Sequence, residues 1–322
     1  MKKYIIFNKK KFSYVIFILC LLFFSGCGQE PEPVHNSDII ESVPPQESAT
    51  ETELMDSEND RTLNLIGIYD IFADADEHAA FFGRSDALEK IISFNQILNS
   101  QFEFYEIYTQ SLESKFYWDM DDSFLDSYNG MPIKNQEINL DGEKCYISRL
   151  NSFQVNSKAY QYFFDFIGEG RGFCEDDFVY KSDERIPVIL GNDYKAYYTI
   201  GDSIELNYLQ KDIEYEVIGF FEQGLNIKIV NSVYDIDKYL CTPFFEFDGD
   251  VRDDFERTFW SRYYEEKNLG YIKVDITDNL SEEEIIELYR VKIKEIAEEL
   301  EIPYSVLDMV YNISSEIVSA DE

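Results

Sequence analysis

Histidine is almost absent from this sequence, and the motifs that would place it in a catalytic centre are missing. Of 322 residues only two are histidine, His35 and His78. The sequence contains no HExxH pair of zinc ligands and no GxSxG nucleophile elbow. His78 lies in the acidic stretch DADEHAAFF, and we expect it to be an ordinary surface residue. The sequence therefore predicts a protein without enzymatic activity.

Cysteine is also scarce, and its spacing excludes a metal or redox pair. None of the five cysteines forms a CxxC pair. Cys20 and Cys27 lie near the N-terminus, which leaves Cys145, Cys174 and Cys241 for the rest of the chain. At most one disulfide can form among these three. We expect each of them to be a small buried apolar side chain.

Positive charge is in short supply, with 28 lysines and arginines against 64 aspartates and glutamates and a net charge of -36. A chain this acidic repels the phosphates of nucleic acids and the headgroups of anionic lipids. The glycine-rich stretch IGEGRGFCEDDF has no Gly-Lys-Ser/Thr, and its acids would repel phosphate, so it is not a nucleotide loop. We expect no nucleic-acid partner and no cofactor.

The acidic stretches lack the residues of a dedicated calcium loop. Residues 119–130 carry acids at alternate positions, but Phe124 stands where the turn glycine belongs and Gly130 stands where the bidentate glutamate belongs. Residues 247–256 match the ligand spacing of a calcium loop no better. We expect no dedicated metal site.

The first residues have the pattern of a secretory signal. Lysines between Lys2 and Lys11 precede an apolar run from Phe12 to Phe24, and Ser25-Gly26-Cys27 follows. The apolar run is shorter than the ~20 residues that span a bilayer. The end of this segment resembles the lipobox of bacterial lipoproteins, with Phe24 where leucine is more usual. That resemblance implies cleavage after residue 26 and lipidation of Cys27, as in palmitate-bearing lipoproteins.

The residues after Cys27 have no hydrophobic period. Residues 27–61 are rich in proline, glutamate, serine and threonine, and such a segment cannot bury enough apolar area to offset its ordering entropy. We expect a disordered tether that holds a folded domain near the membrane. The expected location is the extracytoplasmic face of the cell membrane, on a Gram-positive cell surface.

From residue 62 to residue 322 the pattern is that of one folded region of helices and strands. We expect strands at 64–72, 102–108, 144–150, 186–191, 203–208, 214–221, 226–231 and 270–276. We expect helices from a cap at Ser85 to Leu98, at 156–167, and at 281–301 with a capping box of Ser281 and Glu284. The expected fold class is α+β, in two lobes: an α/β lobe from both ends of the chain and an inserted, mostly β lobe.

The glycine-rich stretch is predicted to be a structural corner between a helix and a strand. Gly170 and Gly172 can adopt positive φ, and Phe173 and Phe178 can anchor the loop by burial. Arg171 can satisfy neighbouring carboxylates or carbonyls with two hydrogen bonds.

A series of short motifs follows this corner in a fixed order. An aromatic segment leads to Gly-Arg-x-Phe with acids after it, then to an apolar strand before a small residue, a Gly-Asp turn and a Val-x-Gly strand. The residues are Gly170, Arg171, Phe173, Gly191, Gly201, Asp202 and Gly219. Over about residues 150–224 this order resembles the MacB-like periplasmic core domain, the extracytoplasmic domain of MacB/FtsX-type ABC transporter permeases.

The resemblance implies a two-lobed domain that contacts export substrates or partner proteins and has no catalytic residues. We therefore expect a non-enzymatic accessory lipoprotein that binds an ABC transporter permease/ATPase complex or its exported peptide. Two alternatives remain open. One is a stand-alone solute- or peptide-binding lipoprotein with its ligand between the lobes, suggested by the aromatic stretch at 114–122. The other is a truncated permease whose N-terminal apolar run stays in the membrane.

Overall fold

The computed structural model describes the chain from residue 61 onward, with short gaps. The described ranges are 61–68, 75–116, 118–128, 131–132, 136–140, 142–181, 184–229, 231–247, 251–274, 280–303 and 306–318. The expected signal peptide, Cys27 and the expected tether up to residue 60 lie outside these ranges. All described residues belong to one compact unit.

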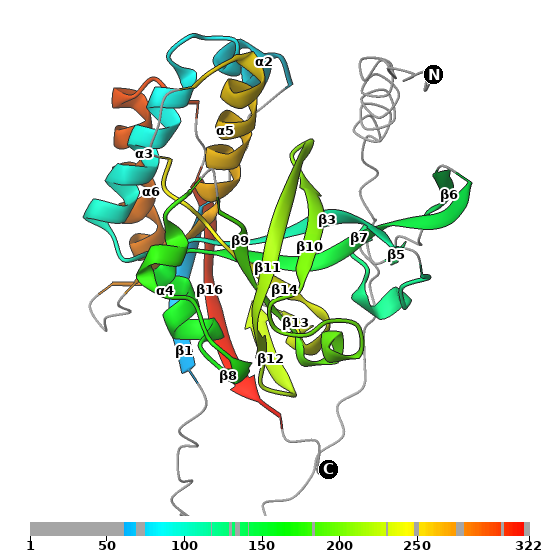
Figure 1. Ribbon diagram of the computed structural model, residues 1–322. Helices are drawn as coiled ribbons and strands as arrows, with labels where there is room; N and C mark the ends of the chain where they lie inside the picture. Colours follow the sequence, from blue (N-terminus) through cyan, green and yellow to red (C-terminus); the bar gives the residue numbers. More distant parts are fainter. Residues whose placement is uncertain are drawn as a thin grey trace, which may run out of the picture. The chain divides into compact units, whose positions relative to one another are not determined.

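One sheet is built largely from the two ends of the described chain and is antiparallel throughout (Figure 1). Its strands, in order, are β13 (Ser232–Asp235), β12 (Leu225–Ile229), β16 (Val306–Ile317), β1 (Arg61–Ile68), β15 (Gly270–Lys273) and β2 (Phe104–Tyr105). β1 and β16 lie side by side in the middle, with Arg61 opposite Ser315. The two chain ends share this sheet as predicted. β12, predicted as part of the inserted lobe, joins it as well, together with β13, which was not predicted.

The second sheet closes on itself. Its strands are β10 (Ser203–Tyr208), β3 (Ile107–Phe116), β7 (Glu143–Val155), β14 (Leu240–Pro243), β9 (Ile186–Leu190), β11 (Lys211–Phe221), β8 (Ile167–Gly170) and β6 (Gln136–Leu140). Because β10 pairs with both β3 and β11, six of these strands form a closed ring, with β8 attached to β11 and β6 attached to β7. The strands predicted at 186–191, 203–208 and 214–221 are confirmed. A separate two-stranded pair consists of β4 (Ser127–Tyr128) and β5 (Met131–Pro132).

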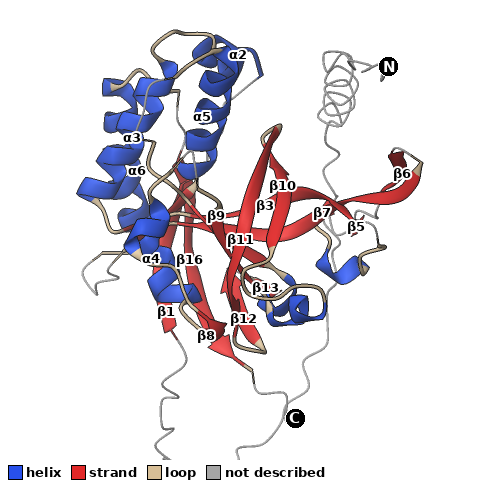
Figure 2. Ribbon diagram, in the orientation of Figure 1, coloured by secondary structure: helices blue, strands red, loops and turns tan. Residues whose placement is uncertain are grey.

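The longer helices gather beside the six-stranded sheet (Figure 2). They are α2 (Ala75–Phe82), α3 (Ala87–Gln101), α5 (Asp254–Lys267) and α6 (Glu282–Glu299). The capping box predicted for α6 is confirmed, because Ser281 N–H donates to Glu284 Oε2 at 2.8 Å and Glu284 N–H donates to Ser281 Oγ at 3.3 Å. The predicted cap at Ser85 is wrong. Asp86 occupies the cap position of α3 but makes no capping bond, since its carboxylate accepts two hydrogen bonds from Arg84.

The helix predicted at 156–167 is shorter and less regular than expected. Asn156 caps a single turn, α4 (Ser157–Ala159), which continues as a turn of π-helix, η2 (Tyr160–Phe164). The wider turn buries three aromatic rings in one core: Tyr160, Phe163 and Phe164. The helix stops there because the chain must pass into β8 at Ile167.

The strand predicted at 102–108 is two strands in different sheets. β2 belongs to the six-stranded sheet and β3 to the closed sheet, and Glu106 lies between them. A cluster of buried apolar side chains spans both sheets, including Phe104 of β2 and Leu112 of β3. The predicted α+β class is confirmed, with the two sheets joined through a shared core. No helix in the described ranges is both long and apolar enough to cross a membrane.

Candidate functional site

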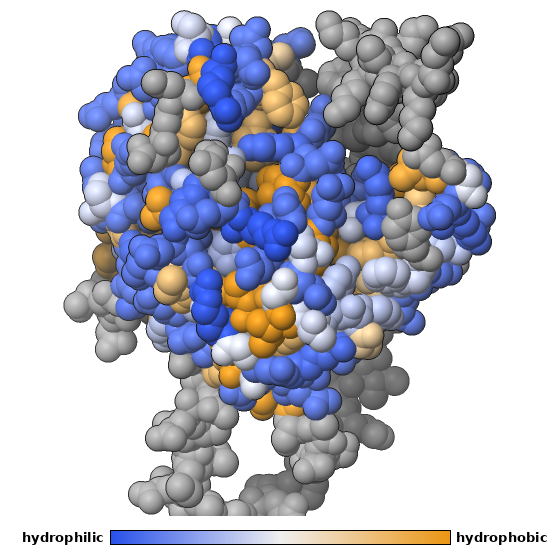
Figure 3. All heavy atoms as spheres, in the orientation of Figure 1, coloured by the Kyte–Doolittle hydropathy of each residue, from blue (hydrophilic) through white to orange (hydrophobic). Residues whose placement is uncertain are grey.

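A surface hollow of about 550 Å³ lies beside the glycine-rich corner. Figure 3 shows apolar side chains at the surface where β11 runs, with hydrophilic side chains around them. The apolar side chains that line the hollow are Val179, Ile186, Pro187, Ile200, Val217, Ile218 and Phe245. Val179 is 48% exposed and Ile200 is 45% exposed. The lining contains no residue of the six-stranded sheet, so the hollow is not a cleft between the two sheets.

Two glycines allow the strands beside the hollow to approach each other. Gly170 of β8 pairs with Gly219 of β11. Gly170 has a φ of 81°, and a Cβ at this position would lie 2.5 Å from the carbonyl oxygen of Ile218. A Cβ at Gly219 would lie 2.5 Å from the carbonyl oxygen of Arg171. Only glycine fits at either position.

Arg171 is fixed at the edge of the hollow by a carboxylate. Its Nη1 donates to Asp177 Oδ2 at 2.6 Å and its Nη2 donates to Asp177 Oδ1 at 3.1 Å, which confirms the predicted bidentate pair. The hydrogen bond to Asp177 raises the pKa of Arg171. Burial alone would raise the pKa of Asp177, but hydrogen bonds from Arg171 and from the Cys174 backbone lower it below its usual value. Both groups are therefore charged at neutral pH.

The other cations of the hollow are also paired. Lys181 Nζ lies 3.1 Å from Glu184 Oε2, and Arg185 Nε lies 2.9 Å from Glu214 Oε1. The lining thus carries charges of both signs around its apolar side chains, with Arg171, Lys181 and Arg185 beside Asp176, Asp177, Glu184 and Glu216. This arrangement matches the polar rim and apolar centre of a protein interface, and it differs from a pocket of one charge sign that would select a small ion.

A tight loop presents Ile200 to the hollow. Asp202 Oδ2 accepts hydrogen bonds from the Thr199 backbone N–H at 2.7 Å and from Thr199 Oγ1 at 3.1 Å. Gly201 has a φ of 91°, and its N–H donates to the carbonyl of Val217 on β11 at 2.8 Å. The Gly-Asp turn predicted from sequence therefore fastens this loop to β11.

The remaining residues of the predicted motif lie away from the hollow. Phe173 packs against Tyr160 and Phe178, with ring centroids 5.0 and 5.7 Å apart. Gly191 follows β9 and faces the backbone of Ile236. The prediction of positive φ is wrong for Gly172. A side chain at this position would meet the Tyr160 hydroxyl.

His78 is not the plain surface residue predicted from the sequence. Its side chain is 22% exposed, and Nε2 lies 2.7 Å from Glu265 Oε1 on α5. Its ring packs on Phe82, 4.5 Å between centroids. Sequence reasoning missed this contact because α5, which supplies Glu265, was not predicted.

The three cysteines of the folded region are free thiols. Cys145 and Cys241 are buried as predicted, but Cys174 is exposed, because it lies in the turn that delivers its backbone N–H to Asp177. Across the ranges that the structure describes, no group of three or more His, Cys, Asp or Glu side chains is placed to hold a metal ion.

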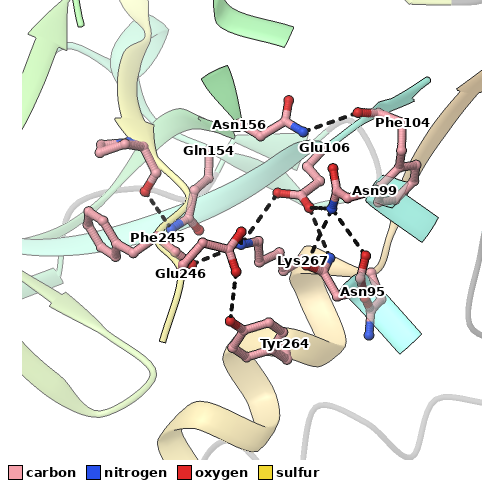
Figure 4. A network of polar contacts seen from close by, with 12 residues as sticks. Asn95, Asn99, Phe104, Glu106, Gln154, Asn156, Phe245, Glu246, Tyr264 and Lys267 are labelled. Carbon is pink, nitrogen blue, oxygen red and sulfur yellow. Dashed lines mark hydrogen bonds and ion pairs between the residues drawn. The ribbon is translucent and has the colours of Figure 1, made fainter. Parts of the chain in front are cut away.

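A buried polar network lies where the two sheets meet (Figure 4). The side chains of Lys267 on α5 and Glu106 are each 1% exposed, and Lys267 Nζ lies 3.8 Å from Glu106 Oε2. Asn95 and Asn99 of α3 donate to Glu106 Oε1 at 2.9 and 2.8 Å. Burial raises the pKa of Glu106, and the charge of Lys267 opposes that rise.

Lys267 also connects this network to the hollow. Its Nζ donates to the carbonyl oxygen of Phe245, a lining residue, at 2.9 Å and to Glu246 Oε1 at 2.6 Å. The backbone N–H of Phe245 in turn donates to the Tyr263 hydroxyl of α5 at 2.5 Å. Both backbone groups of Phe245 are thus held by α5, so this helix fixes one wall of the hollow.

Comparisons with known proteins give distant likenesses. No protein-family model and no curated protein matches the chain. The periplasmic region of MacB from Actinobacillus actinomycetemcomitans is 12% identical, with a TM-score of 0.34, over 77% of this chain and 88% of its own. The extracellular domain of the ABC-type transporter YknZ from Gram-positive bacteria is 12% identical, with a TM-score of 0.35, over 76% of this chain and 99% of its own.

Proposed function

We propose that this chain is a non-enzymatic accessory lipoprotein whose folded domain docks a protein partner of an ABC-type export system at the hollow. One observation carries the proposal. Five of the seven residues of the sequence motif, although some are far apart in the chain, lie at or beside the hollow. Gly170 and Arg171 line the hollow, and Gly201, Asp202 and Gly219 fix the strands and the loop around it.

The surface chemistry of the hollow favours a protein segment as its occupant. The exposed side chains of Val179 and Ile200 offer apolar contact, and the charged side chains of both signs in the lining offer hydrogen bonds to a polypeptide backbone. A protein interface combines an apolar centre with a polar rim in this way. The partner is an extracytoplasmic segment of the permease complex or the peptide that it exports.

The start of the chain supports attachment to the membrane. Ser25-Gly26-Cys27 ends an apolar run in the manner of a lipoprotein signal, and Cys27 is the proposed lipid site. The roughly 30 residues before Arg61 would allow a root-mean-square span of ~30 Å as a flexible chain. That reach would keep the domain beside membrane-embedded partners.

Photocrosslinking in the native host tests the docking surface. A photoreactive amino acid at Val179 or Ile200 should capture a component of an export system or an exported peptide. The matched control is Val291 on α6, which is similarly exposed at 44% but lies outside the lining of the hollow. Equal capture from Val291, or capture of no transport component from either hollow position, would contradict the proposal.

Lipid labelling tests the anchor separately. Labelled palmitate should enter the wild-type protein, and the signal-peptidase inhibitor globomycin should block maturation. Cys27→Ala should lose the label while the folded domain is unchanged. Label retained in Cys27→Ala would place the lipid elsewhere, and no label in either protein would favour a membrane-retained N-terminal helix.

A second candidate function, direct solute or peptide binding, is favoured by one exposed aromatic pair. Trp118 and Tyr197 are each 38% exposed and stack with ring centroids 6.1 Å apart. Such a shelf suits a planar or apolar ligand. Saturable quenching of Trp118 emission in a Trp260→Phe background, by peptides from the host's culture medium, would support this function. No change at millimolar peptide would oppose it.

A further inference from the structure

Two exposed aromatic rings, which we call the aromatic shelf, rest on buried aromatic side chains. Trp118 lies just after β3 and Tyr197 lies just after the helical turn η4 (Asn192–Ala196), and their ring planes differ by only 4°. The ring of Phe116 lies 5.0 Å from that of Trp118, and Phe124 meets Tyr197 edge-on at 5.8 Å. Both supporting rings are buried in the core, so the core fixes the two members of the shelf.

Parallel aromatic faces suit a flat cation. The face of an aromatic ring carries partial negative charge, and tryptophan attracts a cation more strongly than tyrosine or phenylalanine does. The arginine guanidinium is planar and weakly hydrated, and it stacks on aromatic rings while its N–H groups can still bind carboxylates. The lysine ammonium is compact and strongly hydrated, and it has no flat face. The shelf therefore favours arginine among the cationic side chains.

Carboxylates follow the shelf directly in the chain. Residues 118–126 contain four aspartates and no lysine or arginine. Two of them, Asp121 and Asp122, are exposed at the turn that places Phe124 against the shelf. Three residues of chain span about 11 Å at most, so the Cα of Asp121 lies within that distance of the Trp118 Cα. A short peptide with a guanidinium on the shelf can therefore also reach these carboxylates.

The negative charge beside the shelf is maintained at neutral pH. Hydrogen bonds from the hydroxyl and the backbone N–H of Ser123 lower the pKa of Asp121. The lysines nearby are held by other acids: Lys195 of η4 lies 3.2 Å from Glu169, and Lys238, whose charge acts on Asp121, pairs with two other aspartates. In a chain with a net charge of -36, the field at the shelf attracts cations.

We propose that the aromatic shelf, with Asp121 and Asp122 beside Trp118 and Tyr197, binds an arginine-containing segment of a peptide. The guanidinium stacks on the rings, and the carboxylates accept hydrogen bonds from it or from a second basic side chain. The inference rests on the second candidate function, direct peptide binding, and adds the class of peptide, which is cationic. It depends neither on the hollow nor on the lipid anchor.

Calorimetric titration of the full chain in a neutral detergent tests the proposal. The probe is an end-blocked pentapeptide with two arginines between glycines. Its matched control carries citrulline, which has nearly the shape of arginine without its charge. The arginine peptide should bind at least about tenfold more tightly at low salt, because a cation–π contact and two carboxylates act together. Added NaCl should reduce this preference, because salt screens exposed charges.

Ring variants separate the shelf from other exposed aromatics. Trp118→Ala should weaken binding of the arginine peptide at least about fivefold, and Trp118→Phe should weaken it less, because a ring remains. The matched control is Phe255→Ala, which removes a 49% exposed ring among the acids at the start of α5. This control should leave the affinity unchanged.

Charge variants separate the local carboxylates from the net charge. Asp121→Asn combined with Asp122→Asn should weaken binding about threefold, and asparagine can still cap the turn. The control removes the same number of charges at the exposed start of α6, through Glu282→Gln combined with Glu283→Gln. Its effect on the affinity should be smaller.

The outcomes distinguish the class of peptide from peptide binding itself. Equal affinity for the arginine and citrulline peptides would keep direct peptide binding and overturn the cationic specificity. No binding of either peptide would overturn the inference together with the second candidate function. A loss in Trp118→Ala no larger than in Phe255→Ala, or equal losses in the two charge variants, would place the binding elsewhere and overturn the inference.

Discussion

Replacing Lys267 with methionine would leave the carboxylate of Glu106 buried without its cation. The side chains of both residues are 1% exposed, so solvent does not screen the loss. Removing one partner of a buried ion pair costs about 3–5 kcal/mol. We expect the lower end, about 3 kcal/mol, because Asn95 and Asn99 still donate to Glu106. Glu246 adds little, since its side chain is 59% exposed.

The cost of Lys267→Met should depend on pH in a defined direction. Burial raises the pKa of Glu106, and Lys267 opposes that rise. Without the lysine, the carboxyl protonates more readily in the folded state. A group whose pKa is raised in the folded state contributes most to stability below its pKa in the unfolded state. That contribution is lost as the pH rises through its pKa in the folded state. The loss of unfolding free energy in Lys267→Met should therefore be smaller at pH 5 than at pH 8.

Urea unfolding at both pH values measures these effects. Lys294→Met is the matched control, because Lys294 is 66% exposed on α6 and should change stability by less than about 0.5 kcal/mol. The double variant Glu106→Gln with Lys267→Met should recover at least half of the loss, because no buried charge remains. A cost below about 1 kcal/mol for Lys267→Met, or no recovery in the double variant, would refute the reasoning.

Three further changes have defined outcomes. Gly219→Ala should destabilise the fold by about 1–3 kcal/mol because its Cβ would overlap the carbonyl of Arg171, and a urea midpoint equal to wild type would contradict this. Ser281→Ala should cost about 1 kcal/mol through loss of the α6 capping box, and a change within measurement error would show that the cap is redundant. A thiol reagent should label Cys174 in the native protein and the two buried cysteines only after unfolding; native labelling of all three would mean that the core opens readily.

The elements that were predictable from the sequence carry their signal locally. β10 reads as a strand because its apolar residues alternate along SIELNY, and the structure buries Ile204, Leu206 and Tyr208. The start of α6 was predictable because Ser281 and Glu284 stand three residues apart before an apolar period. In both cases the residues that define the element are neighbours in the chain.

Elements that depend on contacts with residues far away in the sequence were not predicted. α5 has the sequence DFERTFWSRYYEEK, in which charged residues interrupt the pattern and even Lys267 is buried. This helix holds Glu106 and the backbone of Phe245, and no local pattern in the sequence links either residue to it. The break of one predicted strand at Glu106 likewise depends on two sheets that meet there.

The hollow was not predicted from the sequence, although some of the residues at and beside it were. The sequence motif selected Gly170, Arg171 and Gly219, but the reason for glycine at residue 219 is the carbonyl of Arg171, which directly follows β8. Which of the corner's glycines adopts positive φ is likewise decided by β11, which packs against Gly170 and not against Gly172. Tertiary contacts decide which positions need glycine or adopt positive φ, and these contacts produce no periodic pattern in the sequence.

The placement of β16 between β1 and β12 has a consequence for biogenesis. Among the described strands, β16 is the latest in the sequence, and it fills the gap between the earliest, β1, and β12 from the middle. Until Val306–Ile317 is available, the inner edges of both neighbours have no partner, and long-range pairing of this kind forms slowly. The central pairings of the six-stranded sheet therefore form only after β16 has been synthesised, so this sheet is completed late in folding.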